Sequence, residues 1–163
     1  MAAEIAVTDT HSLLWYGEPR AHRKLGRHAL ALFQRADVGQ AAVYVPALVL
    51  AEVSELAHLG RIMLQVPFDD WMDGVFGNPC FIAQPLTDQI VRTAHQLFAI
   101  PERGDRVIAA TAMALELPLI TRDPAIAGCA GERGREIKLS LRSGELPRNR
   151  MQVRRTYLPD FSS

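Results

Sequence analysis

The sequence predicts an α/β fold built on a central parallel sheet of about five strands flanked by helices. Short apolar runs, such as residues 5–7 and 43–45, alternate along the chain with longer segments whose apolar residues recur every three or four positions. Strands that are separated by helices favour a parallel sheet covered on both faces. In such a sheet the functional crevice lies at the carboxyl ends of the strands.

The elements follow one another in a regular order. We expect strands at residues 5–7, 43–45, 81–83 and 118–121, with a last edge strand at 137–139. We expect helices at residues 13–15, 20–36, 47–58, 68–76, 87–98 and 104–116, followed by a short helix that Asp123 caps. Pro46 ends the second strand, Gly60 is a C-terminal cap signal and Thr87 is an N-cap.

The composition indicates one ordinary folded domain. The chain has 163 residues, of which 48% are hydrophobic, and 18 basic residues balance 18 acidic ones. Zero net charge excludes a generic polycation that binds nucleic acid by bulk charge alone. Cys80 and Cys129 match no metal or redox spacing. We find no signal peptide and no apolar run of the ~18–20 residues that a membrane span needs, so we expect a soluble, cytoplasmic protein with no membrane partner.

The charge is nevertheless segregated along the chain. Residues 46–88 contain one basic and six acidic residues, a net −5, whereas residues 132–163 contain eight basic and four acidic residues, a net +4. We therefore divide the chain into a folded domain at residues 1–143 and a basic tail at residues 144–163. We expect this tail to be disordered, and binding to RNA or packing on a partner are the alternatives.

Three aspartates occupy equivalent places in the predicted topology. Asp9 and Asp123 each follow a strand, and Asp105 opens the helix before the last of these strands. In a parallel sheet, Asp9 and Asp123 emerge at the same carboxyl edge, and Asp105 joins them if its helix starts there. For any one of them alone, helix capping is the simpler interpretation.

Glu52 changes this interpretation. On the helix at residues 47–58 it shares one face with Leu48, Leu56 and Leu59, so we expect a carboxylate in a core-facing apolar stripe. A buried carboxylate without a partner costs several kcal/mol. A metal ion is the more economical partner, and an arginine such as Arg106 or Arg122 is the alternative.

Four acids without a Cys or His cluster form a hard, oxygen-rich ligand set that suits Mg²⁺, or Mn²⁺ in its place, rather than Zn²⁺. Such an ion activates water and stabilises charge on phosphate oxygens. The residues alone therefore predict metal-dependent phosphoryl or phosphodiester chemistry. An aspartate-based phosphatase or phosphoacceptor is disfavoured because Asp9 begins no DxD motif.

Four motifs occur in order along the chain: DTHSLLW at 9–15, AEV at 51–53, GDRVIAATA at 104–112 and PLITRD at 118–123. This series resembles PIN-domain proteins, specifically the VapC-type toxins of bacterial type II toxin–antitoxin systems, over roughly residues 4–140. The resemblance implies a three-layer PIN-like fold and a metal-dependent endoribonuclease. It also implies an RNA substrate, a cognate antitoxin that occupies the acidic groove, and a homodimer. A catalytically inactive PIN-like module that binds RNA or protein is the alternative.

The acidic set of the family maps onto the same four residues. Asp9, Glu52 and Asp105 would hold the main Mg²⁺, and Asp123 would assist directly or through water. The supporting residues would be Thr10, Thr121, Arg106 and Arg122. The two threonines either orient water or are turn residues, the interpretation we favour for Thr10. The two arginines either contact RNA phosphates or form internal salt bridges. His11 and Trp15 are interpreted as structural residues.

Overall fold

We describe the protein from a computed structural model, in which the structure describes residues 4–123. Four strands form one parallel sheet in the order β3-β2-β1-β4: β1 (Glu4–Thr8), β2 (Ala41–Pro46), β3 (Phe81–Gln84) and β4 (Leu119–Ile120). Val7 of the central strand β1 pairs with Tyr44 on one side and Leu119 on the other. All four carboxyl ends therefore lie at one edge of the sheet, as the alternation of strands and helices predicts.

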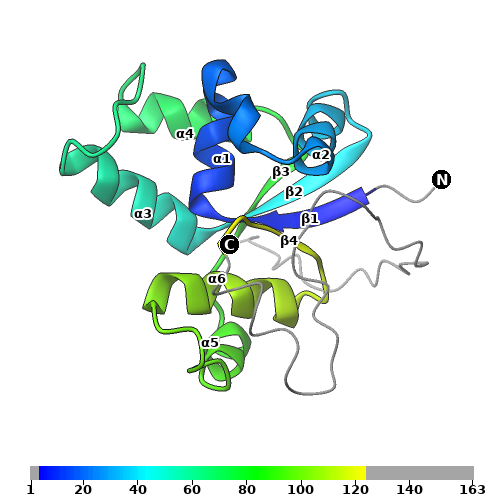
Figure 1. Cartoon of the computed structure of the whole chain (residues 1–163), viewed down its shortest axis with the longest axis vertical. Helices are drawn as coiled ribbons and strands as arrows, with labels where there is room; N and C mark the ends of the chain where they lie inside the picture. The colour runs from blue at the N-terminus through cyan, green and yellow to red at the C-terminus, as the bar shows by residue number, and fades with distance from the viewer. Residues whose placement is uncertain (1–3, 124–163) are drawn as a thin grey trace, which may run out of the picture.

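Helices connect the strands and cover the sheet. They are α1 (Thr10–Gly17), the 3₁₀ helix η1 (Pro19–Lys24), α2 (Arg27–Asp37), α3 (Ala47–His58), α4 (Phe68–Phe76), α5 (Asp88–Ala94) and α6 (Arg103–Ala114). The pair α5 and α6 lies on one side of the sheet, and α1 and α2 lie on the other (Figure 1). The helix α3 begins where β2 ends, at the carboxyl edge. In residues 4–123, no helix is both long and apolar enough to cross a bilayer.

The core forms because the strands and helices present one apolar face each. In β2 the buried Val43 and Val45 alternate with half-buried neighbours, as expected for a strand. In α2 one helical face, Ala29, Leu32, Phe33 and Ala36, is buried against the sheet. Phe33 has no exposed surface, and burial of a side chain of this kind contributes roughly 1.5–3 kcal/mol. This core holds the carboxyl edge in place.

The predicted helices differ from the structure at two places. The helix expected at residues 20–36 is two helices, because Leu25 and Gly26 are extended and Gly26 is the N-cap of α2. The helix expected at residues 87–98 ends at Ala94, after which the chain turns to bury Ile100 in the main core. The apolar spacing continues through both breaks, so periodicity alone did not show them.

Four of the five expected strands are present. The expected edge strand at residues 137–139, the short helix after Asp123 and the tail at residues 144–163 lie outside the described residues.

Candidate active site

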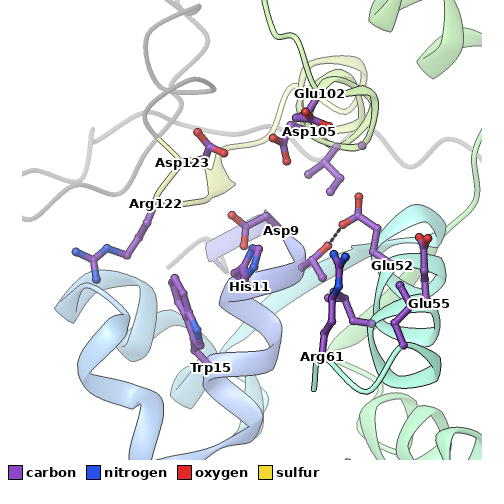
Figure 2. Close-up of a pocket in the computed structure, with 15 residues that line it drawn as sticks. Asp9, His11, Trp15, Glu52, Glu55, Arg61, Glu102, Asp105, Arg122 and Asp123 are labelled. Atoms are coloured by element: carbon purple, nitrogen blue, oxygen red, sulfur yellow. Dashed lines mark hydrogen bonds between the residues drawn. The ribbon is translucent and has the colours of Figure 1, made fainter. Parts of the chain in front are cut away.

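A single pocket at the carboxyl edge of the sheet is lined by all four acidic residues named from the sequence. Asp9 precedes α1, Glu52 lies in the middle of α3, Asp105 lies in the first turn of α6, and Asp123 follows β4. Figure 2 shows these side chains turned toward a common space between α1, α3 and α6. Segments far apart in the sequence therefore supply one carboxylate each.

Asp9 is both a helix cap and a lining residue of the pocket. Its Oδ1 accepts a hydrogen bond from the backbone N–H of Ser12 at 2.7 Å, which makes it the N-cap of α1. Its own N–H donates to the Ile120 carbonyl oxygen at 3.1 Å, so β4 fixes its position at the end of β1. The residue is 7% exposed. Capping and a place in the site, which the sequence offered as alternatives, occur together.

Glu52 lines the pocket together with Leu56 and Leu59, so the predicted core-facing stripe on α3 is correct only at Leu48, which packs against the core. The buried residues of α3 are Val49 and Val53, one position further along the helix. Glu52 is half-buried, and its Oε2 accepts a hydrogen bond from the Thr10 hydroxyl. Thr10 is 3% exposed and begins α1, so it supports Glu52 and is not a turn residue.

No described lysine or arginine forms an ion pair with Glu52, Asp9 or Asp105. Within the described residues, Glu52 is therefore not paired with an arginine, which was the alternative to a metal ion. The polar neighbour of its carboxylate is a neutral hydroxyl, which leaves the negative charge of the site uncompensated by these cations.

The pKa of Asp105 is raised by its burial and by the clustering of acids in the pocket. Burial raises its pKa to about 6, with the negative charges of Asp123, Glu52 and Asp9 and a hydrogen bond with Asp123 acting in the same direction. The sequence predicted that Gly104 and Asp105 open this helix, whereas the N-cap is Glu102, which makes no side-chain capping bond. Asp105 is thus released from capping and points into the pocket (Figure 2).

Asp123 is oriented by Thr121. The backbone N–H of Asp123 donates to the Thr121 hydroxyl at 3.1 Å, and Thr121 is only 6% exposed. Thr121 does not line the pocket, so it acts on the site through Asp123.

The two arginines beside the acids have different positions. Arg106 does not line the pocket: its Nη1 donates to the Ile100 carbonyl oxygen at 3.0 Å, and its guanidinium lies over the Phe98 ring. Arg122 lines the pocket, and its Nη1 donates to the Lys24 carbonyl oxygen at 2.6 Å. Of these two arginines, only Arg122 lines the pocket.

Sequence reasoning missed several lining residues, of which Arg61 is the clearest example. Gly60 has a φ of +65°, the Gly60 N–H donates to Ala57, and the Arg61 N–H donates to Leu56 at 2.9 Å. This is a Schellman motif, which turns the chain back over the end of α3 and brings Arg61 to the pocket. Gly60 is a cap signal in the sequence, but the sequence pattern does not show where the following residue points. His11, Trp15, Glu55 and Glu102 also line the pocket.

Comparison with solved structures finds the crystal structure of FitAcB from Neisseria gonorrhoeae, with a TM-score of 0.53 and 19% sequence identity. The match covers 77% of this chain and 91% of that chain. The chain has a PIN-like fold. The predicted fold class is confirmed, with four strands in the described part of the sheet. No family model matches the sequence, and no curated protein matches it significantly.

The donor chemistry of the PIN-like pocket fits a hard divalent cation. All four candidate ligands are carboxylates, and the raised pKa of Asp105 reflects burial and the repulsion of the neighbouring acids, which a cation relieves. Within residues 4–123, however, no three Asp, Glu, His or Cys side chains are grouped closely enough to hold an ion as they stand. Binding would therefore require the carboxylates to draw together.

Proposed function

We propose that the protein is a metal-dependent endoribonuclease of the VapC type that acts as the toxin of a toxin–antitoxin pair. The proposal rests on one observation: a single pocket at the carboxyl edge of a PIN-like sheet is lined by Asp9, Glu52, Asp105 and Asp123. The motifs that resemble VapC-type toxins contain these same four residues.

In this proposal Asp9, Glu52 and Asp105 hold Mg²⁺ or Mn²⁺, and Asp123 assists. When bound, the ion lowers the pKa of a water molecule and stabilises the charge that develops on the phosphate. Thr10 holds the Glu52 carboxylate by a hydrogen bond, and Thr121 holds the backbone of Asp123. Arg122 and Arg61 line the same pocket and supply positive charge for the RNA backbone on either side of the acids (Figure 2).

The distribution of charge supports a metal requirement in particular. The acids of the pocket repel a polyanion, and residues 46–88 together carry a net −5. Neutralisation of the carboxylates by a divalent ion would remove this barrier, after which the arginines at the rim could engage phosphates. Metal binding would therefore precede RNA binding.

The test is a cleavage assay on structured RNA with Mg²⁺ or Mn²⁺. Glu52→Gln should abolish metal-dependent cleavage. Glu55→Gln is the matched control, because Glu55 lies one helical turn further along α3 and lines the same pocket, but is exposed. We expect it to retain most of the activity. Cleavage that survives Glu52→Gln, or that survives a chelator, would show that the proposed site is wrong.

A second candidate function is a catalytically inactive module that binds RNA or protein. The observation in its favour is the absence, within residues 4–123, of three metal-binding side chains already grouped together. The two candidates differ in a thermal melt: Mg²⁺ should raise the midpoint of the wild type and not that of Glu52→Gln if the pocket is a metal site.

Partners belong to the proposal as well. We propose that a cognate antitoxin covers the acidic groove, that the toxin forms a homodimer, and that it acts in the cytoplasm on RNA. Co-purification with the product of a neighbouring gene, together with loss of nuclease activity in that complex, tests the antitoxin. The mass of the isolated chain in solution tests the dimer.

A further inference from the structure

Part of the pocket lining is aromatic and cationic, beside the acids Asp9 and Asp123. His11 and Trp15 from α1 line the pocket together with Arg122, and Lys24 of η1 is a neighbour of Trp15. The His11 and Trp15 rings are 5.7 Å apart between centroids and are tilted by 42°. Lys24 Nζ lies 5.8 Å from the centroid of the Trp15 ring. Figure 2 shows His11 and Trp15 below Asp9, with Arg122 on the side of Trp15.

The position of these rings follows from the start of α1. Asp9 caps the helix, so His11 lies at its second position and Trp15 one turn later, on the same helical face. The intervening Ser12 and Leu13 are buried and turn inward. The aromatic face therefore begins two residues from the first carboxylate of the site.

Trp15 is only partly buried although it is large and apolar. It packs against the main core with part of its surface and lines the pocket with the rest. Its indole N–H makes no hydrogen bond with any residue in the part of the chain that the structure describes. A ring that served the core alone would not need a place in the acidic pocket.

A hydrogen bond from a side chain to the backbone links two segments of this part of the pocket. Arg122 Nη1 donates to the Lys24 carbonyl oxygen at 2.6 Å, which ties the end of β4 to η1. The Lys24 ammonium group lies near the Trp15 ring, and Arg122 lines the same pocket as the two rings. A partly exposed aromatic ring with cations nearby is a combination by which proteins bind single-stranded RNA, with the ring against a base and the cations against phosphates.

We propose that His11, Trp15, Lys24 and Arg122 form a subsite for one unpaired nucleotide of the RNA. The base packs on Trp15 beside His11, and the adjoining phosphate is held by Lys24 and Arg122. This inference rests on the proposed function, because it places the nucleotide next to the bond to be cleaved. It assigns to Trp15 and His11 a recognition role, where the sequence indicated structural residues.

Tryptophan fluorescence tests the subsite without cleavage. The chain has two tryptophans, and Trp71 packs on Phe68 in α4 and does not line the pocket, so Trp71→Phe leaves Trp15 as the reporter. The titration uses this variant with all four acids intact, Ca²⁺ in place of Mg²⁺ so that the carboxylates are neutralised while cleavage is suppressed, and single-stranded RNA hexanucleotides of one base each. We expect saturable quenching by single strands and little by a duplex of the same length.

Variants separate recognition from folding. By calorimetric titration in the same background, Trp15→Ala should weaken binding roughly 5- to 100-fold, whereas Trp15→Phe should retain most of the affinity. Lys24→Gln should lower the dependence of log K on log salt by about 0.7, and Arg23→Gln, one residue earlier on η1, should not. Equal affinities for Trp15→Ala and Trp15→Phe in folded proteins, or no quenching, would overturn the subsite.

These outcomes are distinguishable from failure of the proposed nuclease. If RNA binds with Trp15 quenching and no variant of the acids affects any cleavage, the subsite stands and the nuclease proposal fails. If the acids are required for cleavage and Trp15→Ala leaves binding unchanged, the nuclease stands and the subsite fails.

Discussion

Gly104 in α6 leaves the space that the carboxylate of Glu52 occupies: a Cβ atom on Gly104 would overlap with Glu52 Oε1 and lie 3.3 Å from Glu52 Cδ. The backbone of Gly104 is helical, so nothing but this contact opposes a side chain there. The absence of a side chain in one helix thus determines where a functional group of another helix lies.

Gly104→Ala should therefore impair activity without loss of stability. Alanine is the better helix former by ~1 kcal/mol, whereas its methyl group pushes the Glu52 carboxylate from its place. We expect at least a ten-fold loss of metal-dependent cleavage and an unchanged or higher midpoint in urea. Gly74→Ala in α4 is the control, since a Cβ there meets nothing within 4 Å. Equal activities of the two variants would contradict the prediction.

The Thr10 hydroxyl should matter to both stability and activity. Thr10→Val keeps the shape of the side chain but removes the donor to Glu52, in a residue that is 3% exposed. Loss of a hydrogen bond to a charged group costs ~1–3 kcal/mol, measurable as a lower free energy of unfolding in urea. Thr10→Ser should restore the donor and most of the cleavage rate. A serine variant no better than valine would mean that the methyl group is what matters.

Two substitutions of Asp9 should separate its capping role from its charge. Asparagine retains the Oδ1 acceptor for the Ser12 N–H, so Asp9→Asn should leave the free energy of unfolding nearly unchanged. Asp9→Ala loses the cap and about 1 kcal/mol. Both should abolish metal-dependent cleavage. An active asparagine variant would show that the charge of Asp9 is dispensable and that its place in the pocket is structural.

The stability of the metal-free protein should depend on Asp105 in a pH-dependent way. Because its pKa is raised to about 6, the folded protein binds a proton more tightly than the unfolded chain, and stability falls as pH rises from about 4 to about 6. Above about pH 6 the full loss of stability caused by the ionised Asp105 carboxylate persists. In EDTA, Asp105→Asn should thus unfold at a higher temperature than the wild type at pH 7.5, with a much smaller difference at pH 4. A pH-independent difference would contradict the mutual repulsion of the acids.

The fold was predictable because its strands are short apolar runs with clear ends. Val43 and Val45 alternate with half-buried residues before Pro46, and the strands are separated by segments long enough for helices. The break at Leu25 and Gly26 was not predictable from periodicity, since Leu25 is buried and fits the apolar pattern of the helix that follows it.

The acids of the site were predictable for a topological reason, and the walls around them were not. Asp9 and Asp123 follow strands, and parallel strands end at one edge. The spacing does not show the orientation of Glu52, because Leu56 and Leu59 on its face line the pocket, whereas Val49 and Val53 are buried. The position of Arg61 depends on a reversal at Gly60 that involves four backbone groups, and spacing along a helix does not describe it.

The wide separation of the carboxylates along the chain has a consequence during synthesis. The four carboxylates come together in the pocket only after β4 has paired with β1, because that pairing fixes the positions of both Asp9 and Asp123. No fragment that ends before residue 123 contains the complete set. A growing polypeptide thus has no complete acidic centre until residue 123 has been made and β4 has paired with β1.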